Sequence, residues 1–377
     1  MPTLAVAALS ARTMAEAARQ GGFDVVALDL FGDPDTRRAC AEWRPIGTSK
    51  PLRIDAEQTL AALRALALRG DVAGWVAGSG FDGLPALLEQ GAEVLPLIGT
   101  AAHAVRRVRD PTAFFGFLES SRIGHPATRF SAPPDGTGWL WKNASGTGGW
   151  HIRQCPLRPE IQLPGGGYFQ RRVPGRAMSA SFIANGRDAC VLGFNEQIVR
   201  SAGAHPFVFC GVVGPVPLGD AVARDLTRAL RLLAAEFSLC GLGSLDFMLD
   251  GDAVALLEIN PRPSASMALY AQSLPRGVMA AHVRACRHAE LPTPTRTQPP
   301  VQGNEIVFAR ARIALDGAAA ARLADLTFCH DLPAADSVFD ADEPVCSVSA
   351  AGADPAAVRT QLSQRREAIL TTLETLA

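Results

Sequence analysis

Short apolar runs and helical patterns alternate through the first part of the chain. Apolar runs with the length of buried strands occur at 4–8, 24–28 and 74–78. Helices are expected over 10–18 and over 59–68, a segment rich in alanine and leucine. We expect Ser10 to cap the first of these helices. Strands and helices that alternate at this spacing predict a parallel, doubly wound α/β sheet.

The loop after the third expected strand has the sequence Gly78-Ser79-Gly80-Phe81-Asp82-Gly83. Ligands of such sheets bind beyond the carboxyl ends of the strands, so we assign this loop to the substrate side. The turn after the first strand contains no G-x-G-x-x-G sequence. This absence disfavours a dinucleotide-dependent oxidoreductase.

The remaining pattern predicts helices over 101–120 and 220–237 and a series of strands between them. These strands are expected at 139–142, 167–173, 177–184, 189–199 and 206–212, with a hairpin at 245–249 and 254–259. Four prolines within 291–303 predict a linker. Beyond the linker we expect a small module with strands near 304–313 and 344–349 and a closing helix over 355–376.

The expected hairpin carries the strongest chemical signal. Asp246 and Glu258 are separated by a turn, and a loop with an odd number of residues, such as 251–253, would place them opposite each other on one face. Asn260 lies two residues further along and shares that face. Two carboxylates and an amide oxygen form the all-oxygen ligand set that Mg²⁺ prefers when phosphates complete its shell. A plain surface hairpin explains the Glu-Ile-Asn-Pro-Arg sequence poorly.

A second signal is Lys142, which precedes the loop Asn143-Ala144-Ser145-Gly146-Thr147-Gly148-Gly149. Glycines allow backbone N–H groups to turn toward an anion, and a lysine on the preceding strand supplies a compact positive charge for a phosphate. Lys142 is one of only two lysines among 36 basic residues. The loop alone is also compatible with an ordinary hairpin turn. The acidic hairpin further along the chain supports the interpretation as a phosphate-binding loop.

Composition excludes several classes of protein. The chain has 377 residues, 48% of them hydrophobic, and a formal net charge of −1. It therefore has enough apolar material for a large core and no broad cationic field for nucleic acid or anionic lipid. No apolar run is long enough to span a membrane, and the N-terminus lacks the basic start of a signal peptide.

The cysteines and histidines do not predict a transition-metal site. The eight cysteines form no C-x-x-C pair, which suits a reduced cytoplasm. His282 and Cys286 share a helical face, but arginines lie between them. We interpret the segment 282–288 as a surface helix.

Taken together, the lysine strand, the glycine loop and the Asp246…Glu258-Ile259-Asn260-Pro261-Arg262 run resemble the ATP-grasp superfamily of carboxylate–amine and carboxylate–thiol ligases. The chain is most similar to a branch described as predicted ATP-dependent carboligases, near the enzymes that assemble one-carbon cofactors. The resemblance implies an α/β fold with α+β grasp lobes. It divides the chain into a Rossmann-like pre-ATP-grasp domain (1–100), an ATP-grasp domain (101–290, with lobes of about 101–166 and 167–290) and a C-terminal module (304–377).

The resemblance also implies roles for individual residues. Lys142 and Arg262 would contact the reacting anions, Ser145, Gly146, Gly148 and Gly149 would cover the phosphates, Gln170, Arg171 and Val173 would lie beside the adenine, and Asp246, Glu258 and Asn260 would bind Mg²⁺ or Mn²⁺. Two departures stand out. The family usually has an acidic residue where Arg171 stands, and a second phosphate-binding lysine is missing, for which Arg106, Arg107 or Arg109 could substitute. The role of His151 stays open.

The resemblance implies an ATP-dependent ligase that activates a carboxylate as an acyl phosphate for attack by an amine and releases ADP and phosphate. The expected partners are small-molecule acids and amines, without nucleic acid or membrane, in the cytoplasm; a homodimer is left open. A nucleotide-binding regulatory or scaffold protein without turnover is the alternative.

Overall fold

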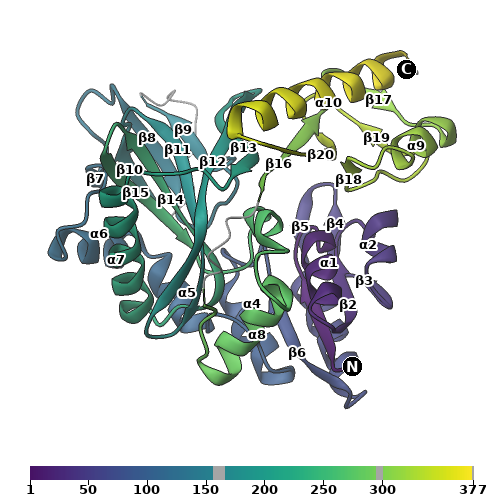
Figure 1. Cartoon of the computed structure of the whole chain (residues 1–377), viewed down its shortest axis with the longest axis horizontal. Coiled ribbons are helices and arrows are strands. Elements are labelled where there is room, and N and C mark those ends of the chain that lie inside the picture. Colours follow the sequence, from purple (N-terminus) through teal and green to yellow (C-terminus); the bar gives the residue numbers. More distant parts are fainter. Residues whose placement is uncertain (156–165, 294–299, 376–377) are drawn as a thin grey trace.

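The computed structural model describes residues 1–155, 166–293 and 300–375. The chain forms an N-terminal α/β domain, a central part built on two sheets, and a C-terminal module that lies on the same side of the molecule as the N-terminal domain (Figure 1). Among the described residues, no helix has both the length and the apolar composition needed to cross a membrane. The eight cysteines are all free thiols.

The N-terminal domain is the expected doubly wound sheet. Its parallel strands have the order β3-β2-β1-β6. The strands are β1 (Thr3–Ala7), β2 (Asp24–Asp29), β3 (Glu42–Pro45) and β6 (Val72–Ala77), with a small hairpin of β4 (Gly47–Ser49) and β5 (Leu52–Ile54). The helices are α1 (Arg12–Gln20), α2 (Pro34–Arg38), α3 (Ala56–Ala67) and α4 (Pro85–Val94). Alternate residues of β1 point into two different cores, Leu4 and Val6 on one face and Ala5 and Ala7 on the other.

The expected Ser10 cap is wrong. Helix α1 has Ala11 at its N-cap position without a side-chain cap, and the Ala11 N–H donates to Asp29 Oδ2 at 2.9 Å. A carboxylate at the end of β2 therefore satisfies this N–H. The Ser10 hydroxyl instead donates to Asp331 of the C-terminal module.

The single helix expected over 101–120 is two helices, α5 (Ala102–Val108) and α6 (Pro111–Ser120). Proline at the first position of α6 cannot continue the hydrogen bonding of a preceding helix, and Asp110 caps the new helix by accepting from the Thr112 N–H at 2.9 Å. The break leaves Arg109 at the end of α5, where its side chain reaches the central part.

The central part has two antiparallel sheets. The small sheet has the order β7-β10-β8-β9 and consists of β7 (Thr128–Arg129), β8 (Trp139–Asn143), β9 (Ile152–Gln154) and β10 (Gly167–Arg171). The large sheet begins with β15-β14-β11-β12-β13. Its strands are β11 (Arg176–Asn185), β12 (Ala189–Ala202), β13 (His205–Gly214), β14 (Cys240–Asp250) and β15 (Ala253–Asn260). Helix α7 (Asp220–Glu236), close to its expected bounds, packs its apolar side on one face of this sheet.

Helix α8 (Gly277–His288) follows the short 3₁₀ helix η1 (Ala265–Tyr270) and is not the surface helix that we expected. His282 is fully buried. Its Nδ1 accepts from the Leu242 N–H at 2.8 Å, and its Nε2 lies 2.9 Å from the Ile98 carbonyl oxygen. His282 therefore joins the large sheet to the segment that leaves the N-terminal domain.

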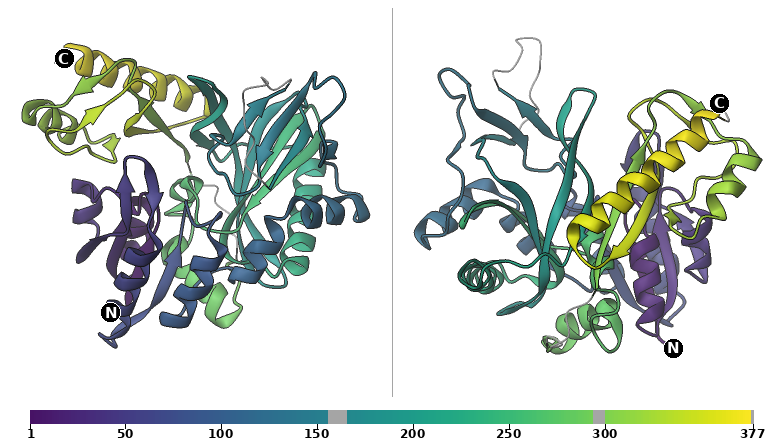
Figure 2. Two further views of the ribbon diagram at one scale, coloured as in Figure 1. Left: turned by 180° about the vertical axis from the view of Figure 1, so that it is seen from behind. Right: turned by 45° about the horizontal axis from the view of Figure 1, so that its top comes forward.

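The C-terminal module continues the large sheet. Of the expected linker 291–303, positions 294–299 lie outside the described residues, and β16 (Val301–Phe308) already pairs with β13. The other elements are β17 (Ile313–Ala314), α9 (Gly317–Ala324), β18 (Cys329–His330), β19 (Val338–Phe339), β20 (Pro344–Gly352) and α10 (Pro355–Thr375). With β16, β20 and β18 the sheet has eight strands, and α10 lies across its C-terminal strands (Figure 2).

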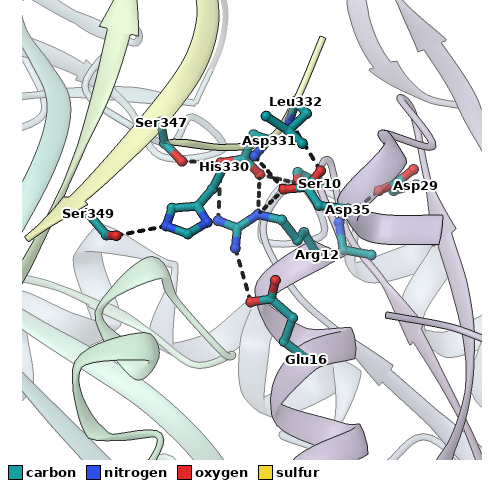
Figure 3. Close-up of polar contacts among 11 residues, drawn as sticks. Ser10, Arg12, Glu16, Asp29, Asp35, His330, Asp331, Leu332, Ser347 and Ser349 are labelled. Atoms are coloured by element: carbon teal, nitrogen blue, oxygen red, sulfur yellow. Dashed lines mark hydrogen bonds and ion pairs between the residues drawn. The ribbon is translucent and has the colours of Figure 1, made fainter. Parts of the chain in front are cut away.

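Polar side chains fasten the C-terminal module to the N-terminal domain (Figure 3). Arg12 on α1 donates from Nε to Asp331 Oδ1 at 2.9 Å and lies 3.4 Å from Asp35. Asp35 in turn accepts from the backbone N–H groups of Asp331 and Leu332 at 2.7 and 3.1 Å. The C-terminal module is thus hydrogen-bonded both to the large sheet and to the N-terminal domain.

Candidate active site

One face of the small sheet presents polar side chains to the large sheet. Lys142 on β8 pairs with Tyr168 on β10, and Leu140 pairs with Gln170, so these four side chains share a face. Lys142 is only 5% exposed and Gln170 only 1%. Burial lowers the pKa of the Lys142 ammonium, while Glu258 and Asp246 on the facing sheet oppose that effect. The lysine therefore lies between the two sheets, close to the acidic hairpin.

The hairpin places its two carboxylates opposite each other, as predicted, but by another route. Asp246 pairs directly with Glu258. The turn has two residues, Gly251 and Asp252, rather than the odd loop we expected, and Gly251 adopts a positive φ of 57°. A bulge between Asp246 and Phe247 then shifts the register by one residue. That bulge brings the carboxylates onto one face.

Asn260 joins the pair. Its Nδ2 donates to Asp246 Oδ2 at 3.2 Å and to Ser244 Oγ at 3.3 Å. Among the described residues, the other carboxylate oxygen, Asp246 Oδ1, is buried and has no partner in hydrogen-bonding geometry, although the nearby Gln197 side chain helps to lower the pKa of this carboxyl group. Within the described residues no group of three His, Cys, Asp or Glu side chains could hold a metal ion. The available set is therefore two carboxylates and one amide.

The pKa values of the two carboxyl groups are shifted in opposite directions. Burial, reinforced by the negative charge of Glu258, raises the pKa of Asp246 to about 7. Burial also disfavours the ionised form of Glu258, but the charges of Arg109, His151 and Lys142 more than offset it, so the pKa of Glu258 is lowered. The two buried carboxylates therefore disfavour each other's negative charge. A cation bound between them would offset this repulsion.

Of the three candidate arginines, the structure places only Arg109 at this site. Arg106 pairs with Glu89 and Arg107 with Glu236, both on the surface. Arg109 Nη1 lies 3.2 Å from Glu258 Oε2, and Nη2 donates to the Ala144 and Gly146 carbonyl oxygens at 2.8 and 2.7 Å. Arg109 therefore connects the acidic hairpin to the glycine loop.

The glycine loop lies folded against the site. Gly148 and Gly149 adopt positive φ angles of 64° and 80°, and a Cβ on Gly149 would lie 1.8 Å from the Phe207 carbonyl oxygen, so only glycine fits there. The Gly148 carbonyl accepts from the Phe209 N–H at 3.0 Å. The Ser145 N–H donates to Asn143 Oδ1 at 3.0 Å, and its backbone closely approaches Gly83.

Arg262 lies where three segments meet. Its Nε donates to Asp82 at 2.9 and 3.1 Å, and its Nη2 is 3.3 Å from both Thr147 Oγ1 and Asn260 Oδ1. Asp82 belongs to the 78–83 loop beyond the end of β6. The loop that we assigned to the substrate side therefore touches the arginine that we expected to contact an anion.

His151 and the end of β10 complete the surroundings. His151 is half-buried, and desolvation of its ring lowers its pKa to about 4. Arg171 is exposed and turns away from Lys142, with Nη1 donating to the Thr137 carbonyl oxygen at 2.8 Å. Its backbone N–H donates to Ala127, and half-buried Val173 follows two residues later.

Several buried polar atoms around this space have no hydrogen-bond partner in the part of the chain that the structure describes. They come from both sheets and from the end of α5: Arg109 Nε, His151 Nδ1, Gln170 Nε2 and Asp246 Oδ1. Most buried polar groups of folded proteins are paired, so a cluster of unpaired ones indicates a place for a polar ligand. Both donors and an acceptor are present, as a ligand carrying anionic groups and a cation would require.

A family described as ATP-grasp domain matches residues 109–266, the segment that contains every side chain placed between the two sheets. Residues 109–266 thus match an ATP-grasp domain. The match begins at Arg109 and includes the glycine loop and the acidic hairpin. The expected resemblance and fold class are thus confirmed.

The chain is also similar to known proteins, in part of its sequence and in its overall fold. The curated carbamoyl phosphate synthase large chain of Methanospirillum hungatei is 30% identical over 103 residues, which is 27% of this chain and 10% of that protein. Among solved structures, biotin carboxylase of Campylobacter jejuni has a TM-score of 0.73 at 12% identity and covers 99% of this chain and 95% of its own. L-Amino acid ligase of Bacillus licheniformis has a TM-score of 0.71 at 13% identity, covering 97% and 96%.

Sequence reasoning did not fully identify three of the residues at this site. Asp82 and Tyr168 were present in quoted segments but were assigned no role, and Arg109 was one of three choices. Only the Asp110-Pro111 break signals that Arg109 ends a helix instead of lying within one. Asp82 and Arg262 are far apart in the sequence, and no local pattern predicts their contact.

Proposed function

We propose that the protein is an ATP-dependent carboxylate–amine ligase. A substrate carboxylate oxygen attacks the γ-phosphorus of ATP, the bond to the bridging oxygen breaks, and ADP leaves with an acyl phosphate remaining. An amine nitrogen then attacks the acyl carbon, the phosphate leaves, and the amine loses a proton as the amide forms. Such chemistry requires positioning and charge neutralisation rather than a side-chain nucleophile.

The observation that carries the proposal is the convergence of Lys142, Arg109 and the Asp246–Glu258 pair between two sheets within the ATP-grasp segment. The set of unpaired buried polar atoms also supports the proposal, because it includes donors for phosphate oxygens and an acceptor that could bind a cation. The names of the related proteins, a carbamoyl phosphate synthase and an L-amino acid ligase, are consistent with such an activity.

Asp246, Glu258 and Asn260 are the residues that would hold Mg²⁺ or Mn²⁺. The fit rests on the unpaired Asp246 Oδ1, on the raised pKa of that carboxyl group, and on the all-oxygen donor set. A magnesium ion bound there would neutralise phosphate charge. Removing this positive charge should leave two buried carboxylates facing the phosphates, which is unfavourable.

The remaining residues would orient the nucleotide and the acid. Lys142 provides a compact ammonium for a phosphate, and Gln170 offers an unpaired amide nitrogen on the same face. Arg262 would receive the substrate carboxylate beside Asn260. The glycine loop, fastened by Arg109, would exclude water that otherwise hydrolyses the acyl phosphate.

Thermal melting tests binding first. ATP with Mg²⁺ should raise the melting temperature, and NAD(P) should not, because the N-terminal sheet lacks the dinucleotide fingerprint. ADP release in a screen of paired acids and amines then tests turnover. Cofactor precursors of the pterin and furan type belong in that screen, because we propose one-carbon cofactor assembly as one setting. Stabilisation by ATP without ADP release from any pair would favour the regulatory or scaffold alternative.

A further inference from the structure

Two cysteines lie next to each other where the first residue of β14 meets α8. Cys240 Sγ donates to the Ala285 carbonyl oxygen at 3.8 Å, and the Cys240 and Cys286 thiols are hydrogen-bonded to each other. Both cysteines are half-buried, so solvent reaches them. The proposed ligase reaction uses neither thiol. The two residues therefore form an accessible pair of thiols whose chemistry is separate from that reaction.

A glycine allows the helix to come this close to the strand. Gly241 follows Cys240 and adopts a positive φ of 82°. A Cβ at this position would lie 2.4 Å from the His282 ring and 2.9 Å from Cys286 Sγ, which is closer than a side chain can approach. Only glycine fits there, and its missing side chain lets α8 bring the Cys286 sulfur up to β14.

The two thiols differ in how readily they lose a proton. His282 cannot accept the proton, because its Nδ1 already accepts from the Leu242 N–H and its Nε2 therefore carries the ring proton toward the Ile98 carbonyl oxygen. The hydrogen bond from Cys286 lowers the pKa of Cys240. The same hydrogen bond, together with burial, raises the pKa of Cys286. Because the thiolate is the nucleophilic form of cysteine, Cys240 is the more reactive of the two sulfurs.

Other cysteines of the chain lack one part of this arrangement. The Cys329 and Cys346 thiols, on β18 and β20, are also hydrogen-bonded to each other, but the two residues are only 5% and 3% exposed. Cys40, Cys155 and Cys190 are half-buried, and burial raises the pKa of each of these thiols. Cysteines that react with oxidants combine a lowered pKa, access to solvent and a neighbouring thiol, as the pair between β14 and α8 does.

We propose that Cys240 and Cys286 form an oxidative modification site, at which a peroxide converts the two thiols into a disulfide. The Cys240 thiolate attacks one peroxide oxygen, the O–O bond breaks, and the leaving hydroxide takes up a proton to become water. The Cys286 sulfur then attacks the sulfenic sulfur of Cys240, the S–O bond breaks, and a second water leaves with the Cys286 proton. Hydrogen peroxide thus accepts the two electrons that the thiols lose. The closed loop contains the whole acidic hairpin.

Peptide mass spectrometry of the full chain tests this inference. The protein is reduced, freed of reductant, treated at neutral pH with a small excess of hydrogen peroxide, and then unfolded and alkylated at its remaining thiols. The Cys240–Cys286 disulfide should form about tenfold faster than a disulfide between Cys329 and Cys346, which oxidants cannot reach. Treatment with a reductant should restore both accessible thiols.

Three variants separate the roles of the two sulfurs. Cys286→Ser should leave Cys240 as a sulfenic acid that dimedone captures, whereas Cys240→Ser should leave Cys286 mostly unlabelled. Cys190→Ser is the matched control, because it removes a half-buried thiol that is hydrogen-bonded to a backbone carbonyl, and it should keep the parent rate of disulfide formation. Melting shows whether each variant folds.

The parent chain alone can overturn the inference. Cys240 and Cys286 that remain alkylatable after peroxide treatment, or a disulfide between Cys329 and Cys346 that forms equally fast, would show that this pair is not a site of oxidation. Equal dimedone labelling of Cys286 in Cys240→Ser and of Cys240 in Cys286→Ser would contradict the assignment of Cys240 as the attacking sulfur. None of these measurements depends on ATP turnover, so the proposed function is tested separately.

Discussion

The buried histidine on α8 allows a quantitative prediction about stability and pH. Burial lowers the pKa of His282 to about 4, against an ordinary value of 6.5. Above the ordinary value both the folded and the unfolded chain carry neutral His282, which then contributes no pH dependence. Between these two pKa values the unfolded chain binds a proton that the folded chain excludes, so the free energy of unfolding falls as pH falls.

The size of this effect follows from the shift. The lowering of the His282 pKa from 6.5 to about 4 corresponds to roughly 3 kcal/mol of unfolding free energy at most, lost progressively between pH 6.5 and 4. Cys286, whose Sγ lies 3.9 Å from Nε2, has its pKa raised and stays an uncharged thiol in this range. Glutamine at position 282 does not titrate, so His282→Gln removes the effect while keeping an amide that can donate and accept.

Urea unfolding at pH 7.5, 6.5, 5.5 and 4.5, followed by tryptophan fluorescence, measures the difference. His282→Gln should be less stable than the parent at pH 7.5, because its hydrogen bonds to Leu242 and Ile98 are disturbed. The difference in the free energy of unfolding between the parent and this variant should decrease by roughly 2–3 kcal/mol by pH 4.5. His288→Gln, at an exposed position on the same helix, controls for the substitution itself. A constant gap across the pH series would show that His282 is not a buried neutral group.

Three further predictions concern the proposed ligase site. Glu258→Gln or Asn260→Ala should abolish ATP turnover at low Mg²⁺ while circular dichroism and melting stay near those of the parent; parent-like turnover in either variant would remove the metal assignment. Lys142→Arg keeps the charge but not the compact ammonium, so affinity for a non-hydrolysable ATP analogue should fall about tenfold, and matching affinities would mean that Lys142 is not a nucleotide ligand. Residues 143–149 should exchange amide hydrogens more slowly with the analogue and Mg²⁺ than without them, and identical exchange in both states would argue against a closing loop.

The chemistry of the acidic hairpin was largely visible in the sequence, because it depends on spacing along one continuous segment. The opposition of Asp246 and Glu258 was predicted, although a two-residue turn and a bulge, and not an odd loop, produce it. A bulge leaves little trace in a single sequence, because any of several residues can occupy it. The facing residues were therefore easier to predict than the backbone geometry that aligns them.

Contacts between distant segments were not predictable in the same way. The burial of His282 depends on Ile98 and Leu242, and the role of Asp82 depends on Arg262. Each of these residues looks ordinary in its local pattern. The parallel sheet, by contrast, follows from local alternation of strands and helices. The N-terminal domain was predicted without β3, β4, β5, α2 and the ten-residue helix α4.

The pairing of β16 with β13 has a practical consequence for anyone who shortens the chain. Ending the protein before Val301 would strip β13 of its partner from Gly211 to Gly214 and leave a row of unpaired backbone N–H and C=O groups. Val213, now fully buried, would lose its cover from the C-terminal core. An open, apolar sheet edge is a template for strand addition by another copy. The truncated protein should therefore aggregate, even though it would still contain the whole segment 109–266.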